Sequence, residues 1–171
     1  MTEKTQKTRS HTWLILSLLL AVALIVVGFV FSRILEKSSD IVETNPVVID
    51  AEFYNEDGQK KITTDDLNSA IDQKKSFVLF VSYPICSEET AQFKEYVREF
   101  QEKNKVSFYY ITTDDIEGTV VKDTIKYFPT VAVFEKGEIK NYLRFDSDED
   151  LQYYKSIEGF SKWFYANVKK G

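Results

Sequence analysis

The single cysteine, Cys86, is the residue of this 171-residue chain best suited to covalent chemistry, and it stands where a helix is predicted to begin. A thiol at a helix N-terminus lies near unpaired N–H groups and the positive end of the helix dipole, which lower its pKa and favour the nucleophilic thiolate. Glu88 and Glu89 fall in the same turn, and their negative charges disfavour the thiolate. These residues alone leave the direction of the net pKa shift open.

A chain with one cysteine cannot form an internal disulfide or a cysteine-based zinc site. The only histidine, His11, precedes a long apolar run, so a Cys-His pair within one chain is excluded if that run spans a membrane. Two roles remain for Cys86. It either takes part in exchange with an outside thiol, or it is a relic in a domain that kept its fold, because no second thiol is present to resolve a mixed disulfide.

Three acidic groups have simpler structural interpretations than catalysis or metal binding. Glu88 and Glu89 diverge by about 100° on a helix, so helix capping is favoured over an acid/base pair. The pair at 114–115 is interpreted as a loop and helix cap. The acidic run at 146–150 lacks the glycine and bidentate glutamate of an EF-hand, which favours a solvated loop over calcium. No metal and no cofactor are expected.

Residues 13–31 form an uncharged run that would span roughly 28 Å as a helix, about the thickness of a bilayer core. The alternative is a cleaved secretory signal, but the run is longer than such a signal requires and no A-x-A-like site follows it. Lys4, Lys7 and Arg9 place the N-terminus in the cytoplasm. We therefore expect a cytoplasmic tail at 1–12, a transmembrane helix at 13–31, a stalk at 32–45 and an extracytoplasmic domain at 46–171.

The part of the chain from the apolar run onward carries 19 basic and 26 acidic residues. An acidic domain is poorly suited to nucleic acid. The predicted partners are therefore the membrane and a polypeptide.

The apolar pattern of the domain predicts alternating strands and helices around a mixed sheet. Strand, helix, strand in succession implies a right-handed crossover and a parallel pair. Ser147 and Asp150 offer a capping box that would start the last helix early, whereas Gly159 favours a break within it. The expected elements are a strand at 47–53, a turn at 55–58, a helix at 64–73, a buried strand at 76–83, a helix with an apolar stripe at 93, 96, 97 and 100, a strand at 106–112, a short helix at 120–126, a hairpin of 131–134 and 138–143, and a helix ending near Val168.

This order of elements, with a cysteine opening the second helix and Pro129 opening the hairpin, resembles the thioredoxin family. The similarity covers about residues 47–168 and is carried by three segments: FVLFVSYPIC at 77–86, FPTVAVFEKGE at 128–138, and SKWFYANV at 161–168. The resemblance implies an α/β thioredoxin-like fold, a central mixed sheet flanked by helices, with a cis peptide bond before Pro129. It also implies a groove for extended polypeptide, lined here by Tyr83, Pro84, Phe128, Pro129 and Thr130.

The chain departs from the family at the redox motif. The family's C-x-x-C reads Cys86-Ser87-Glu88-Glu89, so Glu89 replaces the resolving cysteine. Ile85 replaces the usual tryptophan, and Phe80 stands where many members carry a buried acid. A groove can persist without the dithiol.

Two functions follow as hypotheses. The first is a membrane-tethered accessory or binding protein, similar to the thioredoxin-like bacteriocin transport accessory proteins, that assists export or folding of a partner without dithiol turnover. The second is an extracytoplasmic monothiol oxidoreductase or isomerase acting through Cys86.

Overall fold

The computed structural model describes residues 45–54, 56, 58–84 and 88–170, all within the compact unit Thr44–Gly171. The elements, in chain order, are β1 (Val47–Val48), η1 (Ala51–Phe53), β2 (Gly58–Lys61), α2 (Thr64–Asp72), β3 (Phe77–Ser82), α3 (Glu88–Asn104), β4 (Ser107–Thr112), η2 (Thr113–Asp115), α4 (Val120–Thr124), β5 (Thr130–Glu135), β6 (Glu138–Tyr142), η3 (Leu151–Tyr154), α5 (Ile157–Asn167) and β7 (Val168–Lys169), where η denotes a short 3-10 helix.

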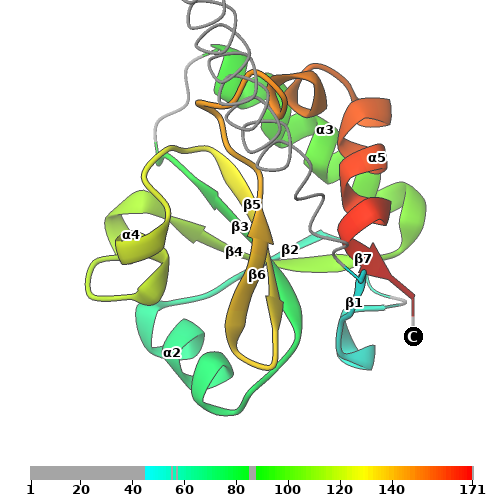
Figure 1. The fold of residues 1–171 in the computed structure, drawn as a ribbon. Coiled ribbons are helices and arrows are strands. Elements are labelled where there is room, and N and C mark those ends of the chain that lie inside the picture. Colours follow the sequence, from blue (N-terminus) through cyan, green and yellow to red (C-terminus); the bar gives the residue numbers. More distant parts are fainter. Residues whose placement is uncertain (1–44, 55, 57, 85–87, 171) are drawn as a thin grey trace, which may run out of the picture. The chain divides into compact units, whose positions relative to one another are not determined.

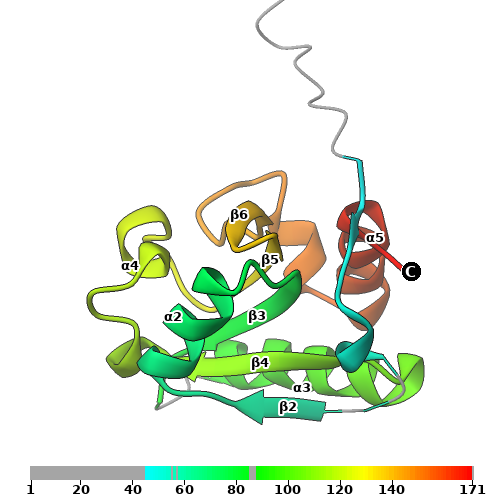
Figure 2. The ribbon, with the colours of Figure 1, turned by 90° about the horizontal axis from the view of Figure 1, so that it is seen from below.

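Five strands form a mixed sheet in the order β2-β4-β3-β5-β6. The strands β2, β4 and β3 are parallel, and β5 runs antiparallel to both β3 and β6. Helices α3 and α5 pack together on one face, and α2 and α4 lie on the other (Figures 1 and 2). The predicted parallel pair and the hairpin are therefore confirmed.

The core is built mainly from aromatic and β-branched side chains. All six residues of β3 are buried, as expected for a strand covered on both faces. The apolar stripe of α3 faces the sheet, with Phe93, Val97 and Phe100 buried and Tyr96 partly exposed. Phe93 packs against Phe80 of β3 and Phe160 of α5, so one helix joins the sheet to its neighbour.

The prediction at the beginning of the domain is wrong for one strand and omits another. Residues 47–53 do not form one strand, because only Val47–Val48 is extended in β1, and it pairs with β7 rather than with the main sheet. The omitted strand is β2, the sheet edge beside β4, which begins at the last residue of the predicted turn at 55–58. The sequence of β2 is Gly-Gln-Lys-Lys, with none of the apolar alternation by which strands are recognised.

The last helix begins later than a cap at Ser147 and Asp150 would place it. Residues 151–154 form the separate turn η3, and α5 is capped by Ser156, whose Oγ accepts a hydrogen bond from the Gly159 N–H at 3.0 Å. Asp150 instead accepts from the Arg144 N–H at 2.8 Å. Helix α5 runs unbroken through Gly159, and the interruption instead lies at residues 155–156, between η3 and α5.

Across the described ranges, no helix is both long and apolar enough to cross a membrane. The predicted span at 13–31 and the cytoplasmic tail lie outside the described residues, as does nearly all of the predicted stalk.

Candidate functional site

The segment between β3 and α3 carries the predicted nucleophile. Ile85, Cys86 and Ser87 lie outside the described residues, as does the Glu89 side chain. The structure describes both flanks, Tyr83 and Pro84 after β3 and the exposed Glu88 that begins α3. Reactivity of Cys86 stays a prediction.

Tyr83 and Phe128 come together at one end of the sheet. Their ring centroids are 6.3 Å apart and the rings are nearly perpendicular, the edge-to-face arrangement that aromatic pairs favour. Tyr83 keeps 43% of its surface exposed, Pro84 is exposed and Phe128 is partly exposed. We call Tyr83, Pro84 and Phe128 the aromatic surface.

The peptide bond between Phe128 and Pro129 is cis, as the resemblance implied. Pro129 and Thr130 are both buried. The Thr130 hydroxyl donates to the Leu143 carbonyl at 2.7 Å, and the Leu143 N–H donates to the Val131 carbonyl at 3.0 Å. Thr130 thus supports the segment from inside and does not form part of the exposed surface.

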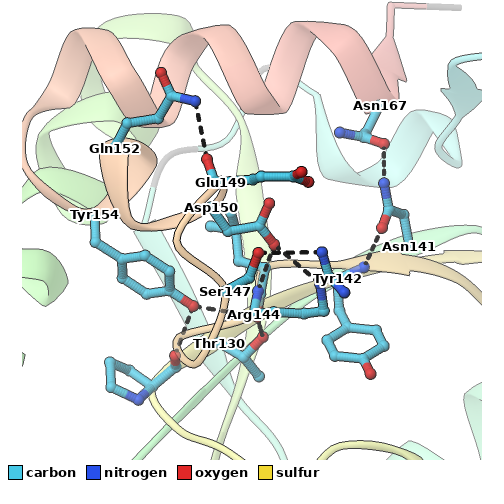
Figure 3. A network of polar contacts seen from close by, with 12 residues as sticks. Thr130, Asn141, Tyr142, Arg144, Ser147, Glu149, Asp150, Gln152, Tyr154 and Asn167 are labelled. Carbon is cyan, nitrogen blue, oxygen red and sulfur yellow. Dashed lines mark hydrogen bonds and ion pairs between the residues drawn. The ribbon is translucent and has the colours of Figure 1, made fainter. Parts of the chain in front are cut away.

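The hydroxyl of Tyr154, on η3, lies between the segment of Pro129 and that of Leu143 (Figure 3). Its hydroxyl donates to the Pro129 carbonyl at 3.0 Å and lies 3.1 Å from the Leu143 carbonyl. Burial raises the pKa of this phenol well above its usual range, and the negative charge of Asp150 acts in the same direction. Tyr154 is therefore a neutral donor that positions the Phe128–Pro129 segment.

A folded loop holds η3 in place. Asp150 accepts from the Arg144 N–H and lies 3.5 Å from the Arg144 Nε, and Arg144 Nη2 donates to Ser147 Oγ at 3.1 Å (Figure 3). Part of the acidic run at 146–150 is therefore used to close this loop. No group of side chains suited to a metal ion occurs in the described ranges.

A hollow of about 330 Å³ opens beside Pro129, between α3 and the segment that follows β6. We call it the Pro129 hollow. Its apolar lining comprises Phe93, Tyr96, Pro129, Phe145, Leu151 and Tyr154. Gln92 and Lys155 also line it. A second hollow of about 260 Å³, lined in part by Lys126, Tyr127, Arg144 and Asp146, lies on the other side of the same segment.

No motif in the sequence indicates that Phe145, Leu151 and Tyr154 belong to the site. Each belongs to the 145–154 segment, which follows β6 in the chain and folds back to Pro129. The available sequence signal was Phe145, a large apolar residue beside an acidic run, and the structure leaves 38% of its surface exposed. Phe80, for which the resemblance to thioredoxins implied a buried acid, is buried against Phe93 and Tyr110 and leaves no ionisable group at that position.

The strand order, the antiparallel β5–β6 hairpin and the cis-proline that opens it define a thioredoxin-like fold. No protein-family model matches the sequence, and no curated protein is significantly similar to it.

Among solved structures, the chain is similar to oxidized thioredoxin O1 from Arabidopsis thaliana, with 18% identity and a TM-score of 0.44 over 55% of this chain and 91% of that one. It is also similar to oxidised thioredoxin from Plasmodium falciparum, with 19% identity and a TM-score of 0.44 over 60% and 98%. A designed protein matches with 16% identity and a TM-score of 0.39 over 70% and 93%.

The buried phenol of Tyr154 predicts a stability loss at high pH. Below about pH 10 the phenol is protonated in both the folded and the unfolded chain, so its full contribution to the free energy of unfolding is present. As the pH rises past that value, the unfolded chain releases this proton first because the folded pKa is raised. Tyr154 should then lower the free energy of unfolding by up to ~1.4 kcal/mol per pH unit.

Tyr154→Phe is the matched control. At pH 8 it should be less stable by about 1–2 kcal/mol, because the buried Pro129 carbonyl loses its donor. Urea unfolding of both proteins from pH 8 to 11 should show that the difference between their free energies of unfolding becomes smaller above pH 10. A difference that stays constant would show that the pKa of Tyr154 is not raised.

Proposed function

We propose that this chain is a membrane-tethered, thioredoxin-like accessory protein that binds a polypeptide at the outer face of the membrane without dithiol turnover. The observation that carries the proposal is the aromatic surface beside the cis Phe128–Pro129 bond, in a chain with one cysteine. Rings with one exposed edge can take a partner's side chains with little loss of rotamer freedom.

The location and the absence of turnover are supported by sequence. The uncharged run at 13–31 and the basic residues before it favour an anchor with the domain outside. Glu89 at the place of a resolving cysteine removes the thiol that would release a mixed disulfide within the site. Assistance in export or folding, as in bacteriocin transport accessory proteins, is the role we propose for such binding.

The test of binding uses the full chain in lipid nanodiscs and a displayed library of random twelve-residue peptides, with empty nanodiscs for subtraction. Enriched peptides are expected, and Tyr83→Ala should weaken their affinity about tenfold, the loss typical of an interface hot spot. The control is Tyr165→Ala, which removes another exposed tyrosine, on α5, and should leave affinity unchanged. Circular dichroism checks that both variants fold. Failure to enrich any peptide would overturn the proposal.

The test of turnover follows the thiol itself. Cys86→Ser should leave peptide affinity unchanged, and the wild-type protein should not accelerate reduction of a peptide disulfide by glutathione. Labelling of Cys86 with a thiol probe across pH should be slow, as expected for a thiol that takes no part in catalysis. An acidic, fast-reacting thiol whose catalysis is abolished by Cys86→Ser would instead establish the monothiol enzyme.

A further inference from the structure

Several of the apolar side chains that line the Pro129 hollow are partly exposed to solvent. Phe145 is 38% exposed, although it meets Tyr154 edge-to-face at 5.2 Å. Tyr96 is partly exposed on the α3 side, and Leu151 is partly exposed on η3. A volume of about 330 Å³ lies at the small end of the range for ligand pockets. It suits a large apolar side chain rather than a whole cofactor.

The described lining of the hollow carries a positive charge, whereas the domain is acidic. Among the described residues that line the hollow, Lys155 is the one charged residue, and it is exposed. Within the part of the chain that the structure describes, Lys155 forms no ion pair, whereas the neighbouring Arg144 lies beside Asp150. A carboxylate of a bound segment can therefore pair with Lys155 while the apolar side chain next to it is buried against the aromatic rings.

The hollow and the aromatic surface share one short segment of the chain, Phe128–Pro129. Phe128 packs against Tyr83, and the next residue, Pro129, lines the hollow. Tyr154 holds that segment by its hydrogen bond to the Pro129 carbonyl and also lines the hollow. An extended chain lying on the aromatic surface can therefore reach the hollow with a neighbouring side chain.

We propose that the Pro129 hollow is the specificity pocket for a polypeptide segment in which an aromatic or large aliphatic residue adjoins an aspartate or glutamate. This inference rests on the proposed polypeptide binding and adds the type of segment bound. The apolar side chain enters between Tyr96, Phe145 and Leu151, and the adjoining carboxylate pairs with Lys155. Segment 145–155 supplies half of the described residues that line this pocket, including its lysine, so the preference depends on this segment.

The experiment is a charge exchange on the same displayed library, with the full chain in nanodiscs. Wild-type protein should enrich peptides with an aromatic or leucine residue next to an acid. Lys155→Glu should lower the affinity for those peptides about five- to tenfold. The variant loses an exposed ion pair and gains a repulsion between like charges, and each of these changes can lower affinity by up to about fivefold. Selection on Lys155→Glu should enrich a lysine or arginine in place of the acid.

The matched control is Lys126→Glu, the same change at an exposed lysine that lines the second hollow. It should change neither the affinity nor the selected motif. Phe145→Ala tests the apolar half and should weaken binding of the selected peptides about tenfold while leaving the acid preference in place. Lys155→Gln, a surface change that should not disturb folding, should give a loss of about two- to fivefold.

The outcomes separate this inference from the proposed function. Peptides that depend on Tyr83 but are indifferent to Lys155 and Phe145 would overturn the specificity pocket and leave polypeptide binding intact. Peptides that respond to the Lys155 exchange but not to Tyr83→Ala would support the pocket and overturn the aromatic surface as the binding site. Absence of any enriched peptide would overturn both.

Discussion

Replacing Gly159 by valine is expected to lower the free energy of unfolding by about 3 kcal/mol, the upper end for overpacking a well-filled site. A Cβ at this position would lie 2.6 Å from the Gln152 carbonyl oxygen and 3.3 Å from the Tyr153 Cα. Both contacts are with backbone, which cannot turn aside as a flexible side chain can. Helix α5 and η3 can pack this closely only because residue 159 has no side chain.

The matched control for Gly159→Val is Ala166→Val in the same helix. Residue 166 is exposed, so the substitution should cost only the few tenths of a kcal/mol of the lower helix propensity of valine. Urea unfolding gives both values. Gly159→Val should also weaken peptide binding at the Pro129 hollow, because η3 carries Leu151 and Tyr154. Equal losses at positions 159 and 166 would show that the close approach does not constrain the domain.

Gly137→Ala is expected to cost about 3–4 kcal/mol, through two effects that add. Gly137 has a φ of +83°, and side chains other than hydrogen cost roughly 1–2 kcal/mol in that region. Its added Cβ would also overlap the Ile71 carbonyl of α2, because the β5–β6 turn is held against the Lys75 carbonyl by a hydrogen bond of 2.9 Å. Overpacking supplies another 1–3 kcal/mol.

Gly118→Ala separates these two effects. Gly118 has a similar φ of +73°, but an added Cβ would meet nothing within 4 Å. This variant should lose only the backbone contribution, about 1–2 kcal/mol. The difference between the two variants in equilibrium unfolding measures the contact between the hairpin and α2. If Gly137→Ala lost no more than Gly118→Ala, that contact would carry no strain.

Sequence pattern predicted the centre of the domain better than its edges. Strand β3 and the stripe of α3 are buried on the core side, so their residues must be apolar at fixed intervals and the pattern is visible. β2 lies at the sheet edge with half-exposed polar residues, and nothing in its composition distinguishes it from a loop. β1 is short because its partner is the two-residue β7.

The sequence likewise predicted one part of the candidate site and not the other. Tyr83, Phe128 and the cis-proline stand next to recognisable elements, and a resemblance of short segments was enough to place them on one surface. The Pro129 hollow required contacts between residues far apart in the chain. Tyr154 is 25 positions from Pro129, and neither residue carries a local sign of the other.

The sequence by itself determined that this protein has one thiol, no resolving cysteine, an apolar run ahead of an acidic domain, and the alternating strands and helices of a mixed sheet. These properties are counts and local periodicities, which do not depend on how distant segments meet. Only the tertiary structure decided that segment 145–155 returns to Pro129, because that return depends on the close packing of η3 that Gly159 permits and on the hydrogen bonds of Tyr154 and Asp150. The contact between Tyr154 and Pro129 joins residues 25 positions apart, so no local periodicity indicates it.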